Sequence, residues 1–177
     1  LKMVGRQEDV NRELEKYDYD KTRVEVVNAT EVIETGEPPV VAIRTKKDSS
    51  LVKCMYMVKH GECDALVSAG STGATLVGGH VIVGRIKGVE RPPLAPLIPT
   101  EKGGALLIDC GANVDAKPSN LVQFAQMGSI YMEKIMNINK PRVGLVNIGS
   151  EEDKGTEVIN EANKLLKETP VNYIGYV

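Results

Sequence analysis

The amino-acid sequence predicts an α/β protein, a three-layer α/β/α arrangement in which helices cover both faces of a largely parallel sheet. Apolar runs of strand length alternate with segments whose apolar residues recur at helical spacing, as in parallel sheets joined by crossover helices. Three loops rich in glycine, hydroxyl or charged residues also follow apolar runs, at 67–75, 109–118 and 147–157. Ligands bind beyond the carboxyl ends of strands in such sheets, so these loops are the candidate sites.

In the first half of the chain, we expect strands at 1–5, 23–29 and 64–70, and helices at 6–16, 38–47, 49–61 and 73–84. The segment 38–47 has proline in its first turn, which suits a helix start. The segment 49–61 spaces its apolar residues on one helical face and ends at Gly61.

Residues 65–84 carry no formal charge and are long enough to cross a bilayer. However, they contain five glycines, two serines and two threonines. We therefore expect a buried strand, a glycine turn and a buried helix here instead of a membrane span.

In the second half, four prolines in 91–100 exclude a regular central strand over that whole segment. A strand is expected at 103–109, paired with the preceding apolar run through the turn "EKGG". A helix should span 118–136 with proline in its first turn, followed by a strand at 142–149, a helix at 156–168 and a strand at 171–175. The apolar face of the helix at 118–136 should contain Leu121, Phe124, Ala125, Met132 and Ile135.

Composition excludes several classes of function. The net charge of −2, a single phenylalanine and the absence of tryptophan argue against nucleic-acid binding. The three cysteines form no C-x-x-C pair and the two histidines lie in separate segments, so we expect no disulfide framework and no metal site. Reduced cysteines suit a cytosolic protein.

The glycine loop at 67–75 has two interpretations. Gly70, Ser71, Thr72 and Gly73 precede a helix, whose unpaired N–H groups favour phosphate. The loop lacks the lysine of a Walker A motif and the G-x-G-x-x-G pattern, and a turn with hydroxyl caps explains it as well.

Two later loops also have a functional and a structural interpretation. In 109–118, Asn113, Asp115 and Lys117 follow Asp109, more polar capacity than one helix cap requires. In 147–157, Lys154 can neutralise a phosphate or an oxyanion, or lie in a solvated charged turn. Arg85, in the charged segment 84–91, likewise suits either an acidic ligand or a solvated surface.

Four segments together resemble the bacterial phosphate acyltransferases of phospholipid synthesis, the PlsX family. They read "DALVSAGSTGA", "GRIKGVERPPLAPLIPT", "LIDCGANVDAKPSNLVQFAQMGSIYMEKI" and "PRVGLVNIGSEEDKGTE". Their order and spacing fit the family over nearly the whole chain. The run "GANVDAKP" followed by "LVQFAQMGS" is highly specific, whereas the glycine loop alone is not.

The resemblance implies transfer of a fatty acyl group from acyl carrier protein to inorganic phosphate, which gives acyl phosphate for phospholipid synthesis. It also implies a fold similar to that of isocitrate dehydrogenases and phosphotransacetylases, no cofactor, a homodimer, and a cytoplasmic protein peripherally associated with the inner face of the membrane. On this basis Lys154, Asn113 and Asp115 are assigned to catalysis. The assigned phosphate- or substrate-binding residues are Gly70, Ser71, Thr72, Gly73, Arg85 and Lys117.

The chain departs from the family pattern at Ser71, where the family usually has asparagine. The opening D-A-M-G-G-D and the later D-G-F-x-G-N segments of the family are not found. We therefore expect residues 1–177 to be a single α/β domain, a fragment without the family's first strand and C-terminal third, and inactive alone. Two alternatives are a non-catalytic module that binds a phosphate-containing metabolite and an inactive truncated remnant.

Overall fold

A computed structural model describes residues 1–101, 103–149, 151 and 154–177. The chain divides into two compact units, Leu1–Lys87 and Gly88–Val177, and each unit is described by itself. Organisation as a single domain, and as a fragment of a longer chain, stays a prediction.

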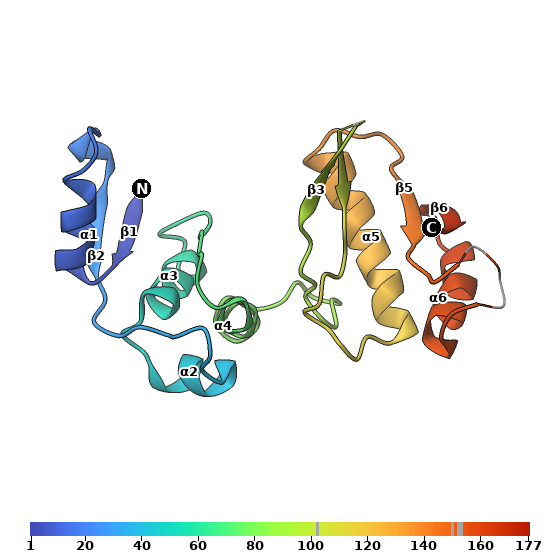
Figure 1. Ribbon diagram of the computed structural model, residues 1–177, viewed down its shortest axis with the longest axis horizontal. Coiled ribbons are helices and arrows are strands. Elements are labelled where there is room, and N and C mark those ends of the chain that lie inside the picture. The colour runs from blue at the N-terminus through green and yellow to red at the C-terminus, as the bar shows by residue number, and fades with distance from the viewer. Residues whose placement is uncertain (102, 150, 152–153) are drawn as a thin grey trace. The chain divides into compact units, whose positions relative to one another are not determined.

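The first unit opens with a strand–helix–strand element. Strand β1 (Lys2–Gly5) pairs in parallel with β2 (Glu25–Asn28), and helix α1 (Gln7–Leu14) and the short 3-10 helix η1 (Lys21–Arg23) connect them. Figure 1 shows α1 alongside both strands. Parallel neighbours require such a crossover connection, which the charged helix predicted at 6–16 provides.

Four helical segments complete the first unit: α2 (Pro39–Thr45), α3 (Ser50–Lys59), α4 (Thr72–Gly78) and a π-helical turn, η2 (Gly79–Val83), that continues α4. Gly61 has a φ of 74° and ends α3 as predicted, because this conformation suits glycine. The helices enclose a hydrophobic cluster of buried residues, namely Ile43, Leu51, Val52, Met55, Ala74 and Ile82.

The second unit contains a hairpin and a parallel pair. Strands β3 (Leu97–Thr100) and β4 (Gly103–Leu106) are antiparallel, whereas β5 (Arg142–Leu145) and β6 (Asn172–Tyr176) are parallel. Helix α5 (Pro118–Lys134) follows the hairpin, and α6 (Glu157–Lys167) connects β5 to β6 (Figure 1). Thr156 caps α6 with its side-chain oxygen, which accepts from the Ile159 N–H.

Most predicted elements are confirmed, with two corrections. Residues 64–70 form no strand, because within the part of the chain that the structure describes no strand pairs with this segment, and the Val67 side chain is 99% exposed. Ile135 is exposed and not part of the buried face, because α5 ends at Lys134. The described strands pair in twos, and two of the three pairs are parallel.

Within the described residues, none of the helices has both the length and the apolar character required to cross a bilayer.

Candidate functional site

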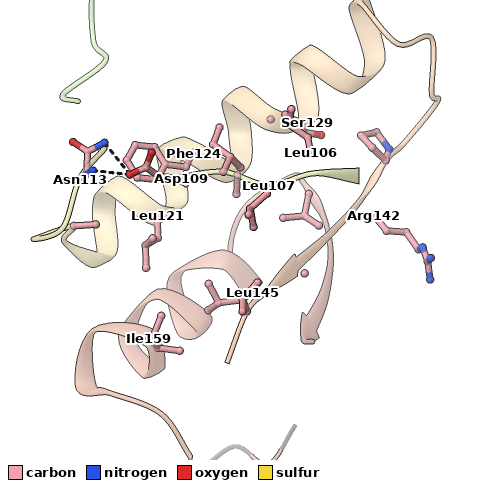
Figure 2. A pocket seen from close by; sticks show the side chains of 18 of the residues that line it. Leu106, Leu107, Asp109, Asn113, Leu121, Phe124, Ser129, Arg142, Leu145 and Ile159 are labelled. Atoms are coloured by element: carbon pink, nitrogen blue, oxygen red, sulfur yellow. Dashed lines mark hydrogen bonds between the residues drawn. The ribbon is translucent and has the colours of Figure 1, made fainter. Parts of the chain in front are cut away.

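A pocket of about 470 Å³ lies within the second unit, between the end of β4, helices α5 and α6, and strand β5. Its walls are largely apolar, and its polar lining includes Asp109 and Asn113 from the loop that follows β4 (Figure 2). A pocket of this size with a few grouped polar atoms is typical of small-molecule sites.

The proline-rich segment before β3 determines how this loop begins. Beyond the regular ladder, the Leu107 N–H donates to Pro96 O at 3.1 Å and the Cys110 N–H donates to Leu94 O at 2.8 Å. Proline has no backbone N–H to donate, so the regular hydrogen-bond ladder between β3 and β4 cannot continue along this segment. The chain therefore leaves the strand close to Asp109.

The Asp109 carboxylate is the centre of the loop's hydrogen bonding. One oxygen accepts from the Leu94 N–H at 2.6 Å, and the other accepts from the Asn113 backbone N–H at 2.6 Å. The Asn113 side-chain amide donates to Pro92 O at 3.1 Å and to the same Asp109 oxygen at 3.3 Å. Figure 2 shows the Asp109 and Asn113 side chains turned toward one another. Hydrogen bonds to an ionised acceptor are strong, so this carboxylate fixes the loop against the 92–94 segment.

A second polar network fixes the start of α5. The Lys117 N–H donates to the Asn120 side-chain oxygen at 2.9 Å, and the Asn120 N–H donates to the Lys117 carbonyl at 3.0 Å. The Asn120 amide, 1% exposed, donates to Glu90 at 2.8 Å. Because a buried amide without partners is costly, this network fixes the helix start next to the 109–113 loop.

The remaining lining is contributed mainly by one face of α5 and by the strands. Phe124, Ala125 and Gly128 are buried. A Cβ atom at Gly128 would lie 3.4 Å from the Ile108 side chain, an ordinary van der Waals contact, so α5 packs against the residues that follow β4. Opposite them, Leu145 of β5 and Ile159 of α6 also line the pocket.

Of the predicted residues in the loop 109–118, Asn113 alone lines this pocket. Asp115 and Lys117 are exposed, and within the described residues the Asp115 carboxylate has no partner. Their assigned roles stay predictions.

Lys154 lies outside the residues that line the pocket. Its ammonium group pairs with Glu151 at 2.7 Å, and both side chains are about half exposed. The hydrogen bond from Lys154 lowers the pKa of the Glu151 carboxyl. The Asn147 amide donates to the Lys154 carbonyl at 3.0 Å, which holds the end of this turn. The predicted loop 147–157 also contains residues 150, 152 and 153, which lie outside the described residues.

The glycine loop 67–75 belongs to the first unit. The Ser71 side chain is buried and accepts from the Ala74 N–H at 3.2 Å, so it caps α4. Gly73 lies close to Pro39, because a Cβ atom there would be 2.7 Å from the Pro39 ring. The structural interpretation of these two residues is therefore observed, while Thr72 is exposed and Gly70 donates to the Ser68 hydroxyl at 3.2 Å. Their binding of phosphate, like that of the exposed Arg85 in the same unit, stays a prediction.

The sequence places Asp109 in the candidate loop but assigns it no catalytic or binding role, and it does not predict the pocket itself. The helical spacing of Leu121, Phe124 and Ala125 indicated an apolar face, but the spacing did not show that this face borders open space. Within the described residues, no cluster of histidine, cysteine or acidic side chains is arranged to hold a metal ion.

Comparison with solved structures defines the class of fold. The chain superposes on the EutD phosphotransacetylase from Staphylococcus aureus with a TM-score of 0.66 and 18% sequence identity, over 98% of this chain and 58% of that one. The predicted α/β class is thus confirmed, in the form of a phosphotransacetylase-like fold.

Sequence comparison identifies the family. The profile of the family described as "Fatty acid synthesis protein" matches residues 1–177, and the chain belongs to this family. It is 54% identical over 175 residues to the phosphate acyltransferase of Clostridium novyi and 53% identical over 175 residues to that of Clostridium tetani. Both matches cover 99% of this chain, and 53% and 52% of the respective relatives. The chain therefore spans about half the length of the curated relatives it matches.

Proposed function

We propose that this chain forms part of an acyltransferase site, at which a fatty acyl group moves from acyl carrier protein to inorganic phosphate and gives acyl phosphate for phospholipid synthesis. The observation that carries the proposal is the match to phosphate acyltransferases over 99% of the chain. The apolar pocket with Asp109 and Asn113 in its lining supports it, because an acyl thioester is itself apolar with one polar reacting group.

The reaction requires positioning and charge stabilisation and no protein nucleophile. A phosphate oxygen forms a bond to the thioester carbonyl carbon, and negative charge develops on the carbonyl oxygen. The carbon–sulfur bond then breaks, and the carrier protein leaves as a thiolate that takes up a proton. Holding the two substrates together and stabilising the oxyanion are the largest contributions that a protein can make to such a step.

In this proposal Lys154, Asn113 and Asp115 act at the reacting centre. Within the described residues, the side-chain oxygen of Asn113 has no donor, so it can accept from a protonated phosphate oxygen. The ion pair of Lys154 with Glu151 is exposed, and an exposed pair contributes little, so a phosphate dianion can displace Glu151. The exposed Asp115 would orient these groups.

Gly70, Ser71, Thr72, Gly73, Arg85 and Lys117 are proposed to bind phosphate or substrate. Ser71 already caps α4 with its hydroxyl, which leaves the exposed Thr72 hydroxyl and the backbone of the loop for phosphate. Acyl carrier protein as a partner, a homodimer, a cytoplasmic location and peripheral membrane association complete the proposal. It includes neither a cofactor nor a metal.

The test is an assay of acyl phosphate with the protein as its gene encodes it. Acyl carrier protein thioester and phosphate are mixed with the protein, and hydroxylamine traps the product as a hydroxamate. Phosphate-dependent hydroxamate supports the proposal. Binding of phosphate without turnover, or neither binding nor turnover, contradicts it.

The role of Lys154 is tested by Lys154→Ala, with Glu151→Gln as the matched control. Loss of a charge that stabilises the transition state should lower turnover by about 100-fold or more. The control removes the same ion pair but keeps the ammonium group, so its turnover should stay within a few-fold of the unmodified protein. Unchanged turnover in Lys154→Ala would remove Lys154 from the site.

A further inference from the structure

We propose that the pocket of the second unit holds the acyl chain of the substrate, with the loop 109–113 at the end where the chain meets its reacting carbonyl. This inference rests on the proposed function. It adds where the acyl chain binds and names Ile159 as a residue that limits the length of the acyl chain. We call this pocket, lined by residues of 106–159, the acyl pocket.

The walls of the acyl pocket have the chemistry that an alkyl chain requires. Helix α5 contributes Leu121, Phe124 and Ala125, while β5 and α6 contribute Leu145 and Ile159. Figure 2 shows side chains of the helices and of the strand converging on the same space. Among the described residues, no lysine or glutamate lines it, and the side chain of Arg142, which does line it, points away from the Asp109–Asn113 pair. An alkyl chain would therefore displace water from apolar surface.

The volume suits a fatty acyl chain better than a short acyl group. A water molecule occupies about 30 Å³ of liquid, so about 470 Å³ has room for on the order of fifteen groups of that size, and a methylene is of similar size. An acetyl group would leave most of this apolar surface in contact with water. Each added methylene should strengthen binding about fourfold until the pocket is full.

The polar atoms of the acyl pocket determine which end of the acyl chain lies at the loop 109–113. Both Asp109 oxygens already accept from N–H groups, while within the described residues the Asn113 side-chain oxygen accepts from none, so a polar group of a ligand can bind at this loop. A thioester head with phosphate beside it fits that end, and the methyl end of the chain fits the apolar remainder. The chain length that the protein prefers should then depend on the volume of the apolar walls.

Ile159 offers a test with a matched control one residue away. Ile159 lines the pocket, whereas Val158, next to it in the first turn of α6, does not and is 37% exposed. Turnover is measured with carrier-protein thioesters of increasing acyl length for Ile159→Phe and Ile159→Ala, and for Val158→Phe and Val158→Ala. Binding of fluorescent fatty acids of the same lengths is measured in parallel.

We expect Ile159→Phe to shift the preferred chain to shorter lengths by about one or two carbons, and Ile159→Ala to shift it to longer ones. Opposite shifts cannot arise from destabilisation, which both variants would cause in the same direction. The Val158 variants should keep the profile of the unmodified protein. Equal profiles for all five proteins, with turnover intact, would overturn the acyl pocket and leave the proposed function standing.

Absence of turnover at every chain length would instead contradict the proposed function. The binding series then decides the inference separately. Length-dependent binding that shifts in the Ile159 variants supports the acyl pocket as a lipid site, and binding that is absent or unaffected by Ile159 overturns it.

Discussion

The two units of the chain use their apolar residues differently. In the first unit, Val52 and Met55 are completely buried in a closed cluster with residues of three other helical segments. The second unit buries Phe124 and Leu166 to a similar degree but leaves an apolar pocket between its helices and strands. Pockets also lie in the first unit, beside β1 and residues 64–67, but the cluster around Val52 and Met55 is filled, whereas the space between α5, α6 and β5 is one that a ligand can fill.

Truncating one apolar side chain in each unit gives the largest difference that this comparison predicts. Met55→Ala should lower the free energy of unfolding by about 2–5 kcal/mol, because it leaves a cavity in a filled cluster. Leu121→Ala should cost about 1 kcal/mol or less, because Leu121 already borders open space. Denaturant unfolding monitored by circular dichroism measures both. Equal losses would mean that the two interiors are packed alike.

The two units should also differ in how their stability depends on pH, and these effects are smaller than those of the truncations. In the first unit, hydrogen bonds from Lys53 and Thr30 lower the pKa of Asp48 below its ordinary value of 3.8. The folded state therefore binds the Asp48 proton less readily than the unfolded chain. This contribution to stability is present above about pH 4 and is lost as the pH falls. In a plot of the free energy of unfolding against pH, Asp48→Asn should reduce the slope below about pH 4.

In the second unit, burial, followed by the charge of Tyr176, raises the pKa of Tyr173 from 10.0 to about 12. The Tyr173 hydroxyl also donates to Asn163 at 2.6 Å. The contribution is present below pH 10 and is lost as the pH rises from 10 to 12. Tyr173→Phe should flatten the alkaline side of the profile and leave the acid side as it was. A change on the acid side would show that the assignment of the two slopes is wrong.

Local chemistry made most elements of both units predictable. Pro118 and the apolar spacing after it predicted α5. The prolines of 91–100 predicted that a regular strand could not span the whole segment, and the strand observed there covers only Leu97–Thr100. The segment 64–70 was mistaken for a strand because its apolar residues satisfy the pattern of a strand, while a strand also needs a neighbour to pair with. The apolar pattern can be read from the sequence, but the presence of a second strand to pair with cannot.

The candidate site was predictable in part for a similar reason. The excess of polar groups after the strand at 103–109 indicated Asn113, which lines the pocket, while its role in catalysis stays a prediction. The pairing of Asp109 with Leu94 could not be predicted, because residues fifteen positions apart meet only after the hairpin closes. The pocket depends on the distances between α5, α6 and β5, and no periodicity in the chain specifies these distances.

The central claim is that the loop 109–113 is part of a reaction site and is more than a structural turn between β4 and α5. Turnover of Asp109→Asn tests this claim most directly, because the substitution keeps the size of the side chain and removes one of the two acceptor oxygens that bind Leu94 and Asn113. Acyl phosphate formation is measured by hydroxylamine trapping at a temperature where unfolding measurements show the variant to be folded. We predict a loss of turnover of about tenfold to 100-fold, since a displaced loop misplaces Asn113 relative to the reacting groups. A folded Asp109→Asn protein with the turnover of the unmodified protein would contradict the account.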